Sequence, residues 1–438
     1  MKLLKISILT LLCSTVTLYA QDKQHVFSLD QAVAFALEHN KTIQSSEKDI
    51  EISQKRYWQA VAAGLPQISA TADYTTMFNY EMSMKSTLTI GADVVPMEMN
   101  SVMKDQSNLK GSFQQLIFSG QYLQGVQITK VLQQLSQQSY QLNELDVKEN
   151  IADAYYLILT AEESKIIVEQ NIGDIEKIMQ HTQNLYKVGM AEITDVDQLK
   201  ITVSQLKNAL SSLENSISLS YNLLRFHLGL SSTDEVKLTD KLDYFLGKQL
   251  YQTLAGSSFD VEQNIQYQMI GTQELLSKKN VSLQKWAFAP SIVGVYSYNE
   301  KLLKPDFDTS PKQLLNFTMA VPIFSSWERM SKVGQAKIEL EKSQLTKDLV
   351  KDQLLLQENQ LRNNLKNAID NYVLQSESVE VAQRVFQNYR NKYEHGMLSS
   401  LQLTQANSNY LTAQSNYLAA AMNLLQAQLK LQKLLNTL

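Results

Sequence analysis

Few side chains in this sequence are of the types that perform catalysis or hold a metal ion. Five histidines share no metal-ligand spacing: His25, His39, His181, His227 and His395. The sequence has neither a phosphate-binding glycine loop nor a G-x-S-x-G phrase, and its acidic residues are scattered. We therefore expect no catalytic residue and no cofactor, assign no metal ligand, and interpret the chain as a protein that is not an enzyme.

Methionine is the one residue type whose concentration could support chemistry. Six methionines lie within residues 77–103: Met77, Met82, Met84, Met97, Met99 and Met103. Thioether sulfurs select soft ions such as Cu(I), which would suit a duct that exports heavy metals. Methionine also fills apolar space or contacts lipid in an extended outer loop, and this interpretation needs no metal. Both interpretations are open from the sequence, and we favour the second.

The first twenty residues (1–20) predict a secretory signal peptide. Lys2 and Lys5 precede an apolar stretch at 6–16 that is too short for a membrane span, and Ala20 ends a cleavage-site pattern. Cys13, the only cysteine, lies inside this leader, so we expect no disulfide in the mature chain. Leader removal changes the formal charge from −4 to −6, and this acidic balance argues against nucleic-acid binding.

Two tracts without proline, at 97–289 and after residue 322, predict long helices. A proline inside a helix costs about 3 kcal/mol, so its absence permits uninterrupted helices. Apolar residues also recur every seven positions, which is typical of helices that pack along a seam. We predict helices at 28–62, 119–186, 192–228, 260–287, 325–393 and 398–437, the two longest spanning roughly 100 Å each.

Between the helices the apolar period changes to two residues, which predicts four strands, at about 66–80, 107–118, 290–300 and 313–324. Each has about the length of a tilted strand that crosses an outer membrane. An ordinary sheet with one buried face is the alternative, but helices of this length cannot fold back to cover it. A sheet in lipid must close, and the smallest closed barrels have about eight strands. Several chains must therefore contribute, and three copies would give twelve strands.

The same order of elements occurs twice in the sequence. A Tyr-x-x-Gly phrase ends each long helix, and its glycines, Gly189 and Gly396, lie 207 residues apart. The first strand pair encloses 18 residues more than the second. We predict a signal peptide at 1–20, a first repeat at 21–229, an irregular connector at 230–258 and a second repeat at 259–438. Each repeat has the order helix, strand, strand, long helix and helix.

This order of elements, together with the stretch Val188–Val196 around the first turn, resembles the TolC-type outer-membrane efflux family over the whole mature chain. The resemblance implies a mainly α-helical fold with a membrane β-barrel portion: a homotrimer with a shared twelve-stranded β-barrel and a periplasmic α-barrel. It also implies a passive duct in the outer membrane, in contact with its lipid. Such a duct is opened by a periplasmic adaptor and by an inner-membrane pump of the RND or ABC type.

The resemblance further implies a gate at the two turns. In the family, an acid six residues after the first turn glycine bonds the tyrosine of the second turn and an arginine just after it. Asp195 and Tyr393 match the acid and the tyrosine, but Leu398 stands at the arginine position, so a weaker closed state is implied. Gln402 and Gln405 stand where the family has a ring of aspartates. Asp195 is also interpretable as a helix N-terminal acid stabilised by the helix dipole.

Two other classes of protein compete with the efflux duct. An exported coiled-coil scaffold or adhesin would also carry long helices, but it has no need for two strand pairs at matching places. A periplasmic adaptor would need a compact β-rich module beside one helical hairpin. The sequence does not identify the cargo.

Overall fold

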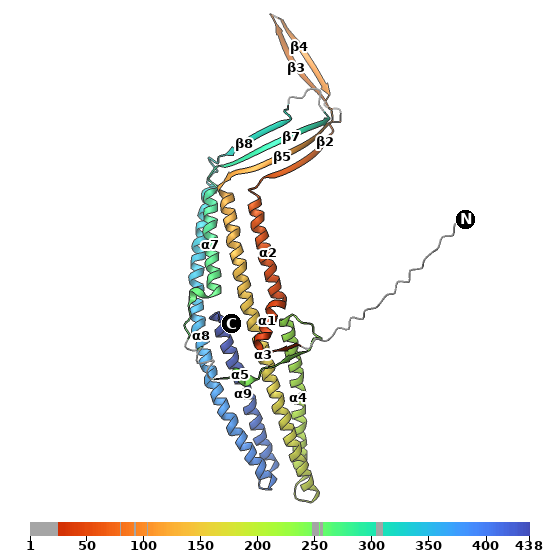
Figure 1. Ribbon diagram of the computed structural model, residues 1–438, viewed down its shortest axis with the longest axis vertical. Coiled ribbons are helices and arrows are strands. Elements are labelled where there is room, and N and C mark those ends of the chain that lie inside the picture. Colours follow the sequence, from red (N-terminus) through yellow and green to blue (C-terminus); the bar gives the residue numbers. More distant parts are fainter. Residues whose placement is uncertain are drawn as a thin grey trace, which may run out of the picture. The chain divides into compact units, whose positions relative to one another are not determined.

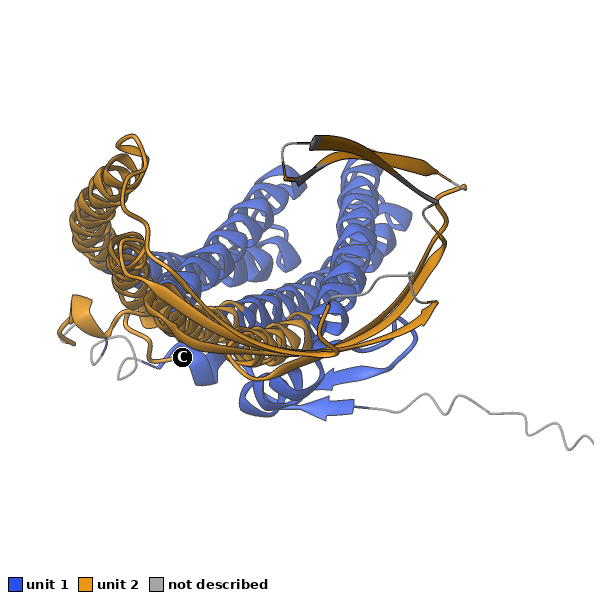
Figure 2. Ribbon diagram, turned by 90° about the horizontal axis from the view of Figure 1, so that it is seen from above, with its two compact units in different colours: residues 1–41, 147–256, 364–430 blue, residues 42–146, 257–363, 431–438 orange. Residues whose placement is uncertain are grey.

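The computed structural model describes residues 25–78, 80–91, 93–102, 104–247, 254, 257–303 and 310–438. The signal peptide, Cys13 and Met103 lie outside these residues. The chain forms two compact units, coloured separately in Figure 2. Unit 1 comprises residues 1–41, 147–256 and 364–430, and unit 2 comprises 42–146, 257–363 and 431–438. Each unit draws on both halves of the sequence.

Two helices dominate the fold: α3 (Gly120–Lys187) with 68 residues and α8 (Glu328–Glu394) with 67. Both begin and end within three residues of the prediction, because neither contains a proline. Within the described part of the chain, no helix has both the length and the apolarity needed to cross a membrane. The other helices are α1 (Leu29–His39), α2 (Lys41–Ala62), α4 (Ile193–Leu228), α5 (Leu242–Phe245), η1 (Val261–Gln263), α7 (Ile265–Trp286) and α9 (Ser400–Leu434).

The helix predicted at 28–62 is divided in two. Ser28 begins α1 with a capping box, in which its side chain and that of Gln31 bond each other's backbone N–H groups. At Asn40 the backbone turns to an extended conformation, and α2 starts at the next residue. The Asn40 amide donates to the carbonyl oxygen of His227 at 2.6 Å, so it satisfies a terminal carbonyl of α4. This tertiary bond explains an interruption that helical periodicity does not reveal.

The predicted irregular connector contains regular secondary structure within unit 1. Its strand β6 (Val236–Leu238) pairs in parallel with β1 (His25–Phe27). Asp240 follows β6, and its Oδ2 accepts hydrogen bonds from the Tyr155 hydroxyl at 2.9 Å and from the Leu29 N–H at 2.8 Å. Tyr155 is fully buried, so the start of α1 and the connector are fixed to the core of α3.

Four strands of unit 2 lie side by side in one antiparallel sheet of order β2-β5-β7-β8 (Figure 1). Their bounds are β2 (Gln67–Thr75), β5 (Gln106–Ser119), β7 (Ser291–Leu303) and β8 (Gln313–Ala320). Side chains in register share one face. One row across the four strands is apolar: Ile68, Phe113, Tyr296 and Leu315. The next row lies on the opposite face and is mostly serine: Ser69, Ser112, Ser297 and Leu314. The hydroxyls of Ser69 and Ser112 lie 2.7 Å apart. The sheet therefore has one largely apolar and one largely polar face.

The extra length of the first strand pair forms a separate two-stranded hairpin, where the sequence predicted a loop. Strands β3 (Glu81–Ile90) and β4 (Asp93–Val102) pair in antiparallel register (Figure 1). Gly91 begins the two-residue turn at φ +67°, a conformation that glycine adopts without strain. Asp105, after the hairpin, accepts a hydrogen bond from the Tyr74 hydroxyl at 2.6 Å.

Gly229→Ala is expected to destabilise unit 1. Gly229 has φ +75°, and a Cβ there would lie 2.4 Å from the carbonyl oxygen of His39. The left-handed conformation alone costs a side chain about 1–2 kcal/mol, so the midpoint of thermal unfolding in detergent should fall. Gly173→Ala is the matched control, because Gly173 lies inside α3 with nothing within 4 Å of a Cβ. That change should raise the midpoint, and equal effects of both variants would contradict the argument.

Candidate functional site

The residues predicted to form a gate lie in unit 1, at and beside the turns α3–α4 and α8–α9. Gly189 and Gly396 adopt left-handed conformations, with φ +77° and +71°. After each glycine, the next N–H donates to a carbonyl five residues earlier at 2.9 Å. The two turns are thus built alike, as helix ends closed by a left-handed glycine.

The helices beside these turns share one apolar core. Its buried residues come from α3, α4, α8 and α9: Ile172, Ile175, Ile178, Leu199, Val203, Leu206, Phe386, Tyr393, Leu403 and Ala406. Leu398, at the position where the family resemblance places an arginine, is half-buried against this core. Residue 398 therefore contributes apolar packing to the site and no charge.

Asp195 and Tyr393 each have a partner that the sequence did not suggest. The Tyr393 hydroxyl lies 2.7 Å from the hydroxyl of Thr182, and this pair is buried. The Asp195 carboxylate accepts a hydrogen bond from the Ser400 hydroxyl and a second from the Glu192 N–H at 3.3 Å. Asp195 thus stands in the first turn of α4 and also links α4 to α9.

Burial raises the pKa of the Tyr393 phenol, the hydrogen bond with Thr182 lowers it, and the nearby charge of Asp195 raises it. A phenol ordinarily titrates near pH 10, so a net raised pKa keeps Tyr393 protonated at neutral pH. The stability linked to this proton is fully present below about pH 10 and is lost as the pH rises through the folded-state pKa. The Thr182–Tyr393 link is therefore a neutral one.

The two glutamines at the predicted constriction are exposed and bond within their own helix. Gln402 accepts from the backbone N–H and the hydroxyl of Ser399, at 3.3 and 3.2 Å, and Ser399 caps the start of α9 in return. Gln405 donates to Asn409 at 3.0 Å. Both carry no charge, so these two positions offer amides to solvent.

Sequence reasoning missed two further links between the helices of this core. Asn171 on α3 and Asn407 on α9 exchange hydrogen bonds of 2.6 and 3.2 Å, with only 3% and 2% of their surfaces exposed. Arg390 on α8 lies 3.7 Å from the carboxylate of Asp174 on α3. Heptad periodicity gave no signal for the first pair, because residues seven positions from Asn407 are Ser400 and Gln414. These contacts hold helices in place and perform no chemistry.

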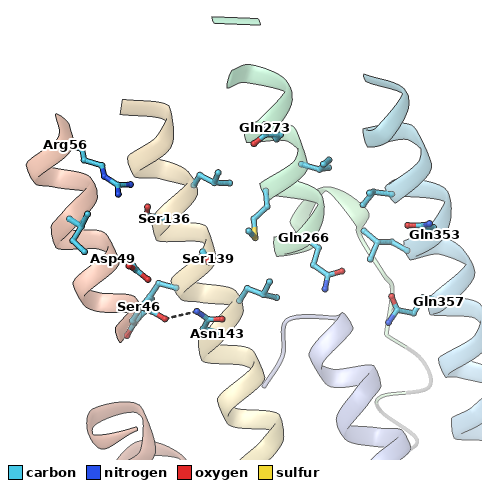
Figure 3. A pocket seen from close by; sticks show the side chains of 18 residues that line it. Ser46, Asp49, Arg56, Ser136, Ser139, Asn143, Gln266, Gln273, Gln353 and Gln357 are labelled. Atoms are coloured by element: carbon cyan, nitrogen blue, oxygen red, sulfur yellow. Dashed lines mark hydrogen bonds between the residues drawn. The ribbon is translucent and has the colours of Figure 1, made fainter. Parts of the chain in front are cut away.

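A cavity of about 780 Å³ in unit 2 is a second candidate site (Figure 3). Side chains from α2, α3, α7 and α8 line it, many of them serines and glutamines. Ser46 and Asn143 are joined by a 2.7 Å hydrogen bond at its wall, and Asp49 and Arg56 are its charged residues. Across the described residues, no three His, Cys, Asp or Glu side chains gather to hold a metal ion.

The family model of the outer membrane efflux protein matches residues 33–230 and 273–437. The chain therefore belongs to this family, that of the TolC-type channels. It is a non-enzymatic channel of the outer membrane whose helical part extends into the periplasm, and channels of this family are trimeric. Membership rules out the scaffold and the adaptor.

Solved channel structures share the fold. The chain is similar to CusC, with 14% identity, a TM-score of 0.74, and 93% of this chain and 92% of that chain covered. It is similar to VceC of Vibrio cholerae, with 16% identity and a TM-score of 0.71. That match covers 93% of this chain and 95% of VceC. It is also similar to MtrE of Neisseria gonorrhoeae, with 15% identity and a TM-score of 0.72. That match covers 93% of this chain and 88% of MtrE. A search of curated proteins finds no match. The predicted fold class is confirmed: a duplicated pattern of helices and strands.

Asn171→Leu or Asn407→Leu alone is expected to destabilise the core of unit 1. Each change leaves the other amide buried without its partner, at a cost of about 1–3 kcal/mol. The double variant removes both amides and should recover most of the lost stability. Denaturant unfolding of all four proteins measures the coupling between the two residues. Additive effects of the two changes would show that the amides do not depend on each other.

Proposed function

We propose that three copies of this chain form one closed channel, the exit duct of a tripartite efflux or type I secretion system. The observation that carries the proposal is the four-stranded sheet of unit 2. Its outer strands β2 and β8 each pair with only one other strand among the described residues. Open edges leave backbone groups without hydrogen bonds, which lipid does not tolerate. Edge-to-edge joining of three such sheets gives a twelve-stranded barrel and leaves no edge.

The two faces of the sheet support the same arrangement. Ile68, Leu315 and Phe317 on the apolar face are 81%, 62% and 65% exposed in the single chain. Apolar side chains that are exposed to this extent need an apolar environment to cover them, and the lipid of the outer membrane would supply it. The opposite face carries serine hydroxyls and would line a water-filled lumen.

The duct has no energy source of its own. Its sequence offers no nucleotide-binding glycine loop, so transport energy must come from another protein. We propose a periplasmic adaptor protein, also called a membrane fusion protein, and an inner-membrane pump of the RND or ABC type as its partners. The duct then acts as a passive conduit from the periplasm to the exterior.

We further propose that the helical turns form its periplasmic gate. The Asp195–Ser400 bond links α4 to α9, and the Thr182–Tyr393 pair links α3 to α8. Opening the gate by moving one helical hairpin past the other would break both links. Gln402 and Gln405 would then face the passage with neutral amides, so the gate would not concentrate cations.

The mature protein is expected to be a trimer in detergent, with a mass near three chains by light scattering and heat-modifiable migration in gels. Phe317→Arg should reduce trimer insertion into bilayers, because a charge on the lipid face costs about 2–4 kcal/mol at the midplane. Thr318→Arg is the control, since residue 318 lies on the opposite face of the same strand. A stable water-soluble monomer would contradict the duct.

Asp195→Ala is expected to raise single-channel conductance in planar bilayers. The charge-assisted hydrogen bond of Asp195 would stabilise the closed state by about 1.5–3 kcal/mol. Its loss would change the ratio of open to closed channels roughly tenfold or more. Leu398→Arg should lower conductance by adding a cationic partner for Asp195. Asp197→Ala, an exposed acid one half-turn further along α4, is the control. If Asp195→Ala and Asp197→Ala conduct alike, Asp195 acts only as a helix N-terminal acid.

A further inference from the structure

The helices of unit 2 meet the four-stranded sheet at one of its ends, and this junction is strongly basic. α2 and α7 end just before β2 and β7 begin, and α3 and α8 begin just after β5 and β8 end (Figure 1). The ten residues of each helix next to the sheet carry two basic residues on α2, three on α7 and three on α8, with Glu328 as the one acid. The whole chain has 40 basic and 44 acidic residues, so this excess of positive charge is a local feature. We call these helix ends the basic junction.

Most charges of the basic junction have no acidic partner. Lys332 forms an ion pair with Glu328 at 2.6 Å, and Lys279 donates to the side-chain oxygen of Gln127 at 2.6 Å. Three others, Lys285, Arg329 and Lys337, have no carboxylate within 4.0 Å among the described residues. Lys285 and Lys337 are exposed and Arg329 is partly exposed, so all three are accessible to an anionic ligand.

All three tryptophans of the chain lie at the same junction. Trp58 lies near the end of α2, Trp286 ends α7, and Trp327 immediately precedes α8, with exposed fractions of 62%, 40% and 69%. Trp286 packs edge-on against Phe118, with 6.5 Å between the ring centres, and Phe118 pairs with Ile292. Ile292 alternates in phase with Tyr296 of the apolar face. Tryptophan is enriched where lipid meets water, which places this boundary at the junction.

The charges lie within electrostatic reach of lipid headgroups at this boundary. Lys337 follows the first residue of α8 by nine positions, about 14 Å along the helix. A headgroup layer adds about 5–8 Å to each side of the hydrocarbon core, and charges act over a further 8 Å or so at physiological salt. The helical part extends into the periplasm, so the leaflet at this end of the sheet is the periplasmic one.

We propose that the basic junction binds the headgroups of anionic phospholipids, such as phosphatidylglycerol, in the periplasmic leaflet of the outer membrane. The inference rests on the proposed barrel, because it requires the apolar face of the sheet to lie in lipid. Arg329 and Lys332 line one cavity of about 570 Å³ together with Trp286, so a single headgroup can contact both cations and the indole. A guanidinium also matches the geometry of phosphate oxygens.

The test uses the mature protein in phosphatidylcholine vesicles that contain a spin-labelled lipid, either phosphatidylglycerol or phosphatidylcholine, with the nitroxide near the headgroup. Every tryptophan lies at the junction, so quenching of tryptophan fluorescence measures lipid binding at this place. We expect phosphatidylglycerol to bind at least about fivefold more tightly than phosphatidylcholine, the effect of one effective charge near the surface. Added salt should reduce this preference, because it screens the attraction.

The triple variant Lys285→Gln, Arg329→Gln, Lys337→Gln should reduce the preference to about twofold or less. Its quenching by spin-labelled phosphatidylcholine should stay at the level of the parent protein, since the tryptophans are unchanged.

The matched control is the triple variant Lys351→Gln, Lys366→Gln, Lys392→Gln. It removes the same amount of charge from exposed positions of α8 that lie about 35 Å or more along the helix from its first residue. It should prefer phosphatidylglycerol as the parent does.

Equal binding of the two lipids by the parent protein would overturn this inference and leave the proposed duct intact. An equal loss of preference in both triple variants would also overturn it, because total charge and not the junction would then be responsible. Absence of quenching by either lipid would contradict the barrel as well, since another copy of the chain and not lipid would then cover the tryptophans.

Discussion

The backbone hydrogen bonds of one open sheet constrain everything else in this molecule. A four-stranded sheet has two edges, and an edge in lipid leaves N–H and C=O groups without partners at several kcal/mol each. Among the described residues, the other strands pair with each other, in the hairpin β3–β4 and in the pair β1–β6, so none of them covers an edge of this sheet. Oligomerisation is thus a condition for membrane insertion, and the requirement that copies join edge to edge dictates how the attached helices must be arranged around a common axis.

The core of unit 1 has a different requirement under the proposed gate: it must be stable and yet able to rearrange. Apolar packing fills most of it, and a few polar links fix which helix faces meet. The links between α3 and its neighbours at Thr182 and Asn171 are uncharged and buried. Neutral pairs cost less to bury than ion pairs and still penalise a shift of one helix along another. Such links fix how the helices are aligned along each other, and they stabilise this alignment only modestly.

Much of the fold could be predicted because long helices and exposed strands leave strong local patterns. The ends of α3 and α8 followed from missing prolines, and the four strands followed from alternation. The break at Asn40 and the partners of Tyr393 and Asp195 could not be predicted, because they depend on residues about 190 to 210 positions away. The hairpin β3–β4 was missed for a different reason: four of its apolar positions are methionines, and Pro96 lies inside β4, where proline is unusual within a strand.

The interleaving of the two halves has a consequence for how the chain folds after export. Unit 1 is assembled from three separate segments, and its buried Asn171 and Asn407 are 236 residues apart. The N-terminal half reaches the periplasm first, with apolar faces that only the later half can cover. Contacts of such long sequence separation form slowly. The newly exported chain therefore passes through a period in which these apolar faces are exposed and prone to aggregation, and the rate of export sets the length of this period.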